Sequence, residues 1–213
     1  MNSLRYTLLS DGGGDQKLLS VLDWVLRQHF PRCAVNGDWA DTGRLRSPPR
    51  GLPEKIERAI ELYPCDVLFI HRDAENQSPG SRISEIDNAV QNSSHQQGQY
   101  VHVIPVRMTE AWLLFDEAAI RFASGNPNGG VHLDVPRAPE LESIPDPKSV
   151  LRDLLLQASE LRGRRRKRFR GASAARLVAE RIVDYRPLRV LPAFAALEDE
   201  VRLLAAKLQP RRP

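Results

Sequence analysis

The sequence predicts an α/β fold with a doubly wound, mainly parallel sheet of four strands. One observation is that short, apolar, β-favouring runs alternate with stretches whose apolar residues recur at the i, i+3, i+4 spacing of a helix face. A second is the run Asp66–His71 (DVLFIH), whose continuous apolar character is typical of a strand covered on both faces by helices. Neighbouring strands joined by helices run parallel, because parallel pairing requires a crossover connection.

The expected strands are short, and each is followed by turn-forming residues. They cover residues 5–10, 33–39, 66–71 and 100–105. The helices between them are predicted from apolar stripes, which are Leu18, Val21, Leu22, Val25 and Leu26 in the first, Leu52, Ile56, Ala59, Ile60 and Tyr63 in the second, and Ile83, Ile86 and Val90 in the third. Thr109 is expected to cap a fourth helix that has Glu110 at its first position.

The chain divides by composition into three parts. Residues 1–123 are expected to form the α/β domain. Residues 124–146 are rich in Gly, Pro, Asn and acidic residues and are predicted to be a linker loop. Residues 147–213 are predicted to be a basic helical region packed on the sheet, with Asp146-Pro147 as a capped helix start and further helices beginning at Ser173 and Pro192.

Net charge is distributed unevenly along the chain. The total is +4, but residues 1–146 carry 14 Lys and Arg against 20 Asp and Glu, a balance of −6, whereas residues 147–213 carry 17 against 7, a balance of +10. An acidic half that binds a cation and a basic half that attracts phosphates would suit an enzyme acting on a polyanion.

The cellular compartment of the protein is predicted from three missing features: a membrane span, a secretory signal and a disulfide or zinc-site pattern. No apolar run approaches the length of a membrane span, and the first residues do not resemble a secretory signal. Cys33 and Cys65 show neither disulfide nor zinc-site spacing and are expected to be inert core thiols. We therefore expect a cytoplasmic protein with no membrane contact.

Five acidic residues follow the expected strands and are the candidate metal ligands and catalytic groups. Asp11 and Asp15 follow the first strand, Asp73 and Glu75 follow the third, and Glu110 follows the fourth. Parallel strands present their carboxyl ends at one edge of a sheet, where ligands bind. Converging carboxylates repel one another unless a cation lies between them, and Mg²⁺ (or Mn²⁺) prefers such oxygen ligands. Asp11, Asp15, Asp73 and Glu75 are the expected ligands, and Glu110 joins Asp11, Asp73 and Glu75 as a catalytic candidate.

The glycine-rich turn after the first strand is a candidate phosphate site. Gly12 and Gly13 would let the backbone approach a phosphate, with Lys17 at the start of the next helix and Arg107 before Glu110 as cations. The turn lacks the lysine and Ser/Thr of a P-loop, and Lys17 replaces the third glycine of a dinucleotide fingerprint. A plain tight turn whose Asp15 caps the helix is an equally good interpretation.

His71-Arg72-Asp73 is similar to a kinase catalytic loop, but this function is excluded. Ser78 occupies the position of the metal-binding Asn, and no glycine-rich loop with a strand lysine precedes it. His71 is instead expected to be a strand-end residue or a hydrogen-bond donor to a ligand, rather than a ligand itself. The stretch beginning at Trp112 is expected to be core.

The segment 162–170 (RGRRRKRFR) contains seven cations and is the one biased stretch of the sequence. A charge run is commonly a solvated face, but a helix with this density of positive charge repels itself without a polyanion nearby. We expect it to contact nucleic acid rather than an acidic protein. The residues expected to bind phosphates are Arg164, Arg165, Arg166, Lys167, Arg168 and Arg170.

The segments LLSDGGGDQKLL, VLFIHRDAE and PVRMTEAWLL resemble those of the Toprim fold of topoisomerases, primases and overcoming-lysogenization-defect nucleases. More narrowly, they resemble a bacterial Toprim-like family of unknown function whose members are often encoded beside ATPases in phage-defence loci. The resemblance implies a magnesium-dependent nuclease in which Asp11 is base or ligand and Asp73 with Glu75 are ligands. Asp11 stands where the family has Glu, and Glu75 where it has a second Asp.

The sequence thus predicts a metal-dependent endonuclease, a hydrolase of phosphodiester bonds. The family resemblance implies a role in phage defence with an ATPase partner. The two departures from the family pattern motivate an alternative, a nucleic-acid-binding or partner-docking subunit with a degenerate metal site. A third hypothesis, phosphoryl transfer to or from free nucleotides, is disfavoured by the basic C-terminal half.

Overall fold

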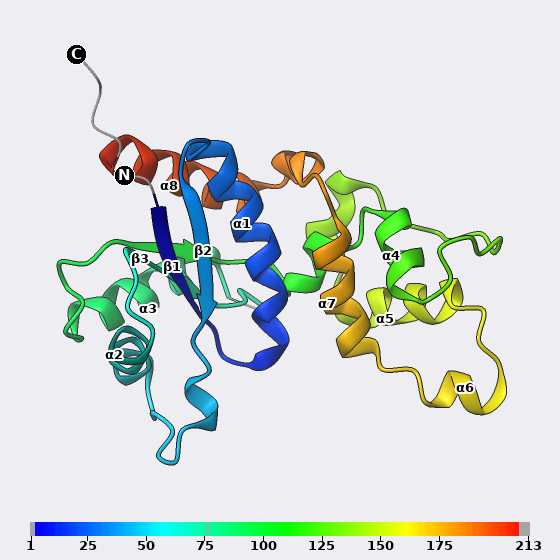
Figure 1. Cartoon of the computed structure of the whole chain (residues 1–213), viewed down its shortest axis with the longest axis horizontal. Coiled ribbons are helices and arrows are strands. Elements are labelled where there is room, and N and C mark those ends of the chain that lie inside the picture. The colour runs from blue at the N-terminus through cyan, green and yellow to red at the C-terminus, as the bar shows by residue number, and fades with distance from the viewer. Residues whose placement is uncertain (1–2, 76, 209–213) are drawn as a thin grey trace.

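The computed structural model describes residues 3–75 and 77–208. Its centre is a sheet of four strands, all parallel, in the order β2-β1-β3-β4 (Figure 1). The strands are β1 (Ser3–Leu9), β2 (Ala34–Trp39), β3 (Val67–His71) and β4 (Tyr100–Val103). The predicted α/β class and parallel sheet are confirmed, and each strand lies within two residues of its expected position.

Helices surround the sheet and form most of the C-terminal region. The α-helices are α1 (Leu18–His29), α2 (Leu52–Leu62), α3 (Pro79–Gln91), α4 (Glu117–Ala123), α5 (Pro147–Ala158), α6 (Gly163–Lys167), α7 (Gly171–Arg181) and α8 (Pro192–Leu208). The short 3₁₀ helices are η1 (Gly13–Lys17), η2 (Thr42–Arg44), η3 (Thr109–Leu113), η4 (Ala138–Ser143) and η5 (Arg186–Val190).

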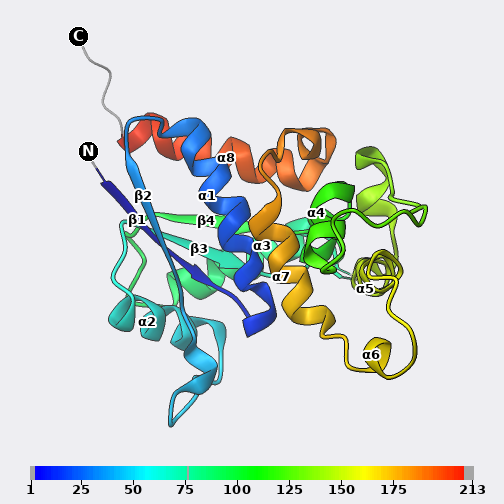
Figure 2. The same cartoon turned by 45° about the vertical axis from the view of Figure 1, so that its right-hand side comes forward.

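The two faces of the sheet pack into two separate cores. In β3, Val67 and Phe69 point into one core and Leu68 and Ile70 into the other, because side chains alternate along a strand. The smaller core lies beneath α2 and α3, and the larger lies beneath α1 and the helices that follow β4. Figure 2 shows α1 and α2 on opposite sides of the sheet. All five residues of β3 are buried, which explains its uninterrupted apolar sequence.

The C-terminal helices belong to the larger core and are not a loosely attached extension. Val178 of α7 and Phe194 of α8 are fully buried in the cluster that also contains Leu4 of β1. Helix α8 contacts α1 and β4, and α7 contacts η1. Helices α7 and α8 are therefore packed against the elements of the sheet domain.

Two expected elements differ in the structure. No α-helix begins at Thr109: residues Thr109–Leu113 form η3, and α4 begins at Glu117 with Asp116 as its cap, accepting a hydrogen bond from the amide of Ala119. Thr109 is fully buried and its hydroxyl contacts His71 instead of capping a helix. The expected linker loop 124–146 includes the helix η4. Trp112 is core, as expected.

Strand β4 forms one edge of the sheet, and α8 covers this edge. The amide of His102, on β4, donates a hydrogen bond of 3.0 Å to Oε2 of Glu200 on α8. The His102 ring lies between Glu200 (Nδ1 to Oε1, 2.9 Å) and Asp87 of α3 (Nε2 to Oδ1, 3.0 Å). A carboxylate thus binds an outward-facing amide that an uncovered edge strand would leave free.

Among the helices of residues 3–75 and 77–208, none combines the length and apolar character that a bilayer crossing requires.

Candidate metal centre

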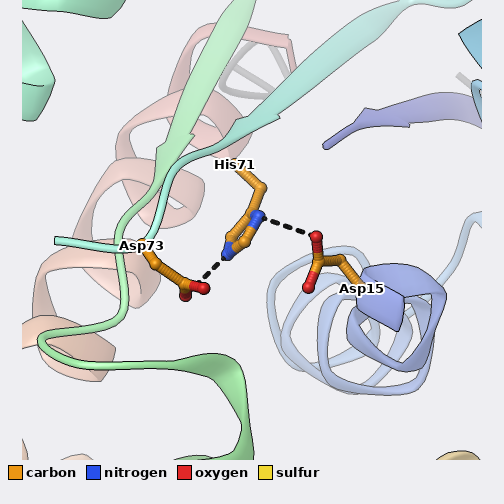
Figure 3. A group of neighbouring side chains, drawn as sticks. All are labelled: Asp15, His71 and Asp73. Carbon is orange, nitrogen blue, oxygen red and sulfur yellow. Dashed lines mark hydrogen bonds and ion pairs between the residues drawn. The ribbon is translucent and has the colours of Figure 1, made fainter. Parts of the chain in front are cut away.

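Three side chains meet at the carboxyl edge of the sheet: Asp15, His71 and Asp73. Asp15 lies in η1 directly after β1, His71 is the last residue of β3, and Asp73 lies two residues further on. One potential ligand atom from each lies within 4.8 Å of the others (Figure 3). These residues form the Asp15–His71–Asp73 group. It is the one cluster of three or more metal-ligating side chains among residues 3–75 and 77–208.

His71 is held between the two carboxylates. Its Nε2 lies 3.1 Å from Oδ1 of Asp73 and 3.2 Å from the hydroxyl of Thr109, while its Nδ1 lies 3.6 Å from Oδ2 of Asp15. The His71 side chain is only 2% exposed, and its Nδ1 makes no hydrogen bond. If Nε2 carries the proton and donates it to Asp73, Nδ1 presents a lone pair toward Asp15. A lone pair facing a carboxylate in a buried site is repulsive unless a cation or proton lies between them.

Asp15 shows the electrostatic strain of this arrangement. Burial raises the pKa of its carboxyl group; the charges of His71 and Lys17 lower it, and those of Asp73 and Glu110 raise it again. The net result is a pKa above the ordinary value of an aspartate. A bound cation would stabilise the carboxylate form and remove this strain.

Lys17 and Glu110 form an enclosed ion pair beside the group. The Lys17 ammonium lies 3.1 Å from Oε1 of Glu110, donates to the carbonyl of Gly14 at 2.6 Å, and lies 3.7 Å from Oδ1 of Asp15. The Lys17 side chain is 4% exposed. Lys17 was expected to bind phosphate, but it already neutralises two carboxylates. Glu110 is correspondingly tied to Lys17 and does not join the Asp15–His71–Asp73 group.

Asp11 is held by cations instead of joining the other acids. It accepts a hydrogen bond of 2.8 Å from Lys55 of α2 and pairs with Arg72, which also binds Glu85 of α3 at 2.8 Å. Burial alone would raise the pKa of Asp11, but the hydrogen bond from Lys55 and the charge of Arg72 lower it below its usual value. The structure therefore does not place Asp11 with Asp15 and Asp73, as the sequence analysis expected.

Glu75 also lies outside the group. It is exposed and adopts a positive φ of 52°, a conformation that side chains other than Gly, Asn and Asp rarely adopt. Its carbonyl accepts a hydrogen bond of 3.2 Å from Arg107, which links this loop to the segment after β4. The expectation that all five acids converge is thus corrected: two of them, Asp15 and Asp73, meet around a histidine.

The glycine turn positions Asp15 without a side-chain cap. Gly12 precedes η1 with extended φ and ψ angles, its carbonyl accepts from the amide of Asp15 at 3.1 Å, and no side chain caps the helix. The Asp15 carboxylate is therefore not used as a helix cap. Gly13 lies against the ring of Trp39, where an added Cβ would come within 3.4 Å of it.

The polybasic segment lies on the surface, away from the strands. Arg164, Arg165, Arg166 and Lys167 belong to α6, and Arg168 and Arg170 follow it; all six are exposed. In Figures 1 and 2, α6 lies beyond α5 and the start of α7, on the side of the molecule toward which β1 runs. Its cations can therefore contact a long polymer without entering the Asp15–His71–Asp73 group.

Sequence reasoning missed three residues that shape the centre: Thr109, which contacts His71, and the two cations around Asp11, Lys55 and Arg72. Arg72 could have been recognised as a site residue, because it stands between His71 and Asp73 at the end of the most apolar strand. No feature of the sequence indicated Lys55, because its contact with Asp11 depends on how α2 packs beside the sheet.

Comparison of the chain with protein-family models, curated proteins and solved structures finds no significant match. Function is therefore inferred from the Asp15–His71–Asp73 group, its surroundings and the distribution of charge.

Proposed function

We propose that the chain is a divalent-metal-dependent nuclease that hydrolyses phosphodiester bonds at the Asp15–His71–Asp73 group. The observation that carries this proposal is the buried Nδ1 of His71, which has no hydrogen-bond partner and faces Asp15 at 3.6 Å. Buried polar atoms in proteins are nearly always paired, so an unpaired ring nitrogen beside a carboxylate favours a cation bound to both.

The residues present fit a metal ion. Asp15 and Nδ1 of His71 would hold it, and Asp73 would fix the tautomer and orientation of the ring by accepting a hydrogen bond from Nε2. Carboxylate oxygens suit Mg²⁺ and Mn²⁺, and the imidazole nitrogen shifts the preference toward Mn²⁺. When bound, such an ion polarises a phosphoryl oxygen and lowers the pKa of a coordinated water.

The surrounding residues have distinct tasks in this proposal. Lys17 pairs with Glu110 and lies near Asp15, so its positive charge opposes the repulsion between the two carboxylates. The hydroxyl of Thr109 contacts Nε2 of His71 and restricts the orientation of the ring. The exposed cations of 162–170 would bind the phosphates of the polymer outside the centre. An ATPase partner and a role in phage defence are further proposals that rest on the resemblance of the N-terminal motifs.

Cleavage assays with matched variants test the function. Purified protein is incubated with plasmid, single-stranded DNA and tRNA in Mg²⁺, Mn²⁺ or EDTA. We expect metal-dependent cleavage that falls about 10- to 100-fold or more in Asp15→Asn and Asp73→Asn. Glu75→Gln is the control, because it removes an acid of the same loop that lies outside the group. Full cleavage by folded Asp73→Asn and Asp15→Asn would refute the assignment.

A second candidate is a nucleic-acid-binding subunit without turnover. It is favoured by the state of Asp11 and Glu75, which correspond to ligands in the resembling family but are here paired with cations or exposed. This candidate predicts salt-sensitive binding that is equal in EDTA and Mn²⁺, with no product on any substrate. Metal binding measured by calorimetry separates the two, since the nuclease requires Asp15 and His71 to bind Mn²⁺.

A further inference from the structure

A cavity of about 380 Å³ lies between η1, α5 and α7, immediately beside the proposed metal centre. Gly14, Lys17 and Glu110 line its inner side. Because Lys17 also contacts Asp15 at 3.7 Å, a ligand in this cavity is separated from the Asp15–His71–Asp73 group by one ion pair. The volume is within the range of small-ligand sites in proteins.

The outer side of the cavity is positively charged. Lys148 and Arg152 lie one turn apart on α5, both exposed, and neither forms an ion pair within 4.0 Å with a residue that the structure describes. Helix α7 begins at the cavity with Gly171 and has no side-chain cap, so its first-turn amides are available to an anion. Two exposed cations and uncapped helix amides beside one cavity favour a phosphate ligand.

The wall between these cations is apolar, which a bare phosphate would not use. It is formed by Leu151, Leu155, Ala172 and Ala175. An uncharged apolar ligand would make no contact with the charges of Lys148 and Arg152, whereas a nucleotide can contact both the cations and the apolar wall. Its phosphate would meet the cations and amides, and its base or sugar would cover the apolar wall.

From this chemistry we propose that the cavity binds one nucleotide of the substrate, unstacked, next to the phosphodiester that is cleaved. This inference rests on the proposed function and specifies the substrate. A base enters the cavity only if it is not paired, and extruding one from a duplex costs a few kcal/mol. The substrate class is therefore single-stranded nucleic acid or a strand with an unpaired end.

The test measures the binding of nucleic acid to the protein in EDTA, so that the result depends on neither metal nor cleavage. The probes are a short fluorescein-labelled oligothymidylate and a duplex of the same length, titrated with the full chain and followed by anisotropy. We expect the single strand to bind more tightly than the duplex. Arg152→Gln should weaken single-strand binding several-fold, and Arg202→Gln, which removes an equal charge on α8, should change it less than about twofold.

A matched pair of acidic substitutions isolates the cavity from the general charge of the region. Ala172 and Ser173 are both exposed in the first turn of α7, but Ala172 lines the cavity and Ser173 does not. Aspartate at either position is favourable for the helix, so both variants should fold. We expect Ala172→Asp to weaken oligothymidylate binding about tenfold and Ser173→Asp to weaken it much less.

Equal effects of Ala172→Asp and Ser173→Asp, equal affinity for both probes, or no binding by the wild-type chain would each overturn the inference. A different pattern of results would show that the proposed nuclease function is wrong while the nucleotide-binding cavity is right. In that case the wild-type chain binds the single strand and responds to Ala172→Asp, yet yields no product with any metal.

Discussion

Lys17 and Glu110 are an ion pair in which each charge depends on the other. Because the Lys17 side chain is 4% exposed and that of Glu110 12%, neither charge can be solvated adequately when its partner is removed. We expect Lys17→Met to lower the free energy of unfolding by about 3–5 kcal/mol, as measured by urea denaturation. The double variant Lys17→Met/Glu110→Gln should recover most of this loss, because the Glu110 charge that Lys17 compensates is then absent as well. A double variant as unstable as the single one would contradict the explanation.

Gly37 is required by the side chain of its neighbour in the sheet. Tyr6 on β1 pairs in register with Gly37 on β2, and a Cβ added at Gly37 would clash with the Tyr6 ring. The ring cannot move freely, because its hydroxyl donates a hydrogen bond of 2.8 Å to Asp23. The ring itself packs against Phe69. We expect Gly37→Ala to destabilise the fold by about 1–3 kcal/mol.

Thermal denaturation of Gly37→Ala measures this cost, and Gly43→Ala is its control, because an added Cβ at Gly43 meets nothing within 4 Å. Equal melting temperatures for Gly37→Ala and the wild type would show that β2 shifts at no cost.

At the scale of elements, the ring of His102 on β4 lies between carboxylates of α8 and α3, and we expect its charge to stabilise their packing. Burial lowers the pKa of His102, but the hydrogen bond and charge of Glu200 on α8, followed by those of Asp87 on α3, outweigh this and raise it above 6.5. Burial, followed by the hydrogen bond to Asp87, raises the pKa of Tyr100 to about 12, so this group stays neutral. A histidine with a raised pKa contributes stability fully below its unfolded pKa and loses it as pH rises through the folded value.

The free energy of unfolding should therefore fall as pH rises from about 6.5 through the raised pKa of His102. His102→Gln should lack this fall and should approach the stability of the wild type at alkaline pH. Urea denaturation across this pH range, with both proteins in the same buffers, provides the measurement. Parallel pH profiles for the two proteins would show that the Glu200–His102–Asp87 contacts do not stabilise the charged ring.

At the scale of the whole molecule, the separation of charge predicts strongly salt-dependent binding. The described residues of α6 supply four exposed cations on the side toward which the first strand runs. Each phosphate contact contributes about −0.9 for duplex DNA, or −0.7 for a single strand, to the slope of log affinity against log salt. Replacing Arg164, Arg165, Arg166 and Lys167 by Gln should reduce the slope by about 2–3, measured by anisotropy in EDTA. An unchanged slope would remove this segment from the interface.

The sequence predicted the sheet well because its signals are local. The apolar run 66–71 and the stripe from Leu18 to Leu26 each indicate their element without reference to the rest of the chain. The edge at which Asp15, His71 and Asp73 meet follows from parallel pairing alone. Thr109 was misassigned because a threonine before a Glu has the same local signature whether it caps a helix or contacts His71.

The detailed composition of the centre could not be predicted, because it depends on contacts that are distant in sequence. Asp11 and Asp15 lie four residues apart on the same glycine turn, and nothing local indicates which of them reaches Asp73. The choice is made by Lys55 and Arg72, which hold Asp11 away from the group. The nucleotide cavity likewise requires α5 and α7 to pack beside η1, a contact that no sequence spacing reveals.

The cover of β4 by α8 has a consequence for biosynthesis. All four strands emerge from the ribosome well before Pro192–Leu208, so a nascent chain can complete its sheet while the amide of His102 still lacks its acceptor, Glu200. During that interval the edge of β4 is open to pairing with other nascent chains, and the part of the sheet that α8 covers is exposed. We therefore expect the nascent chain to depend on chaperones or on rapid translation of its last third.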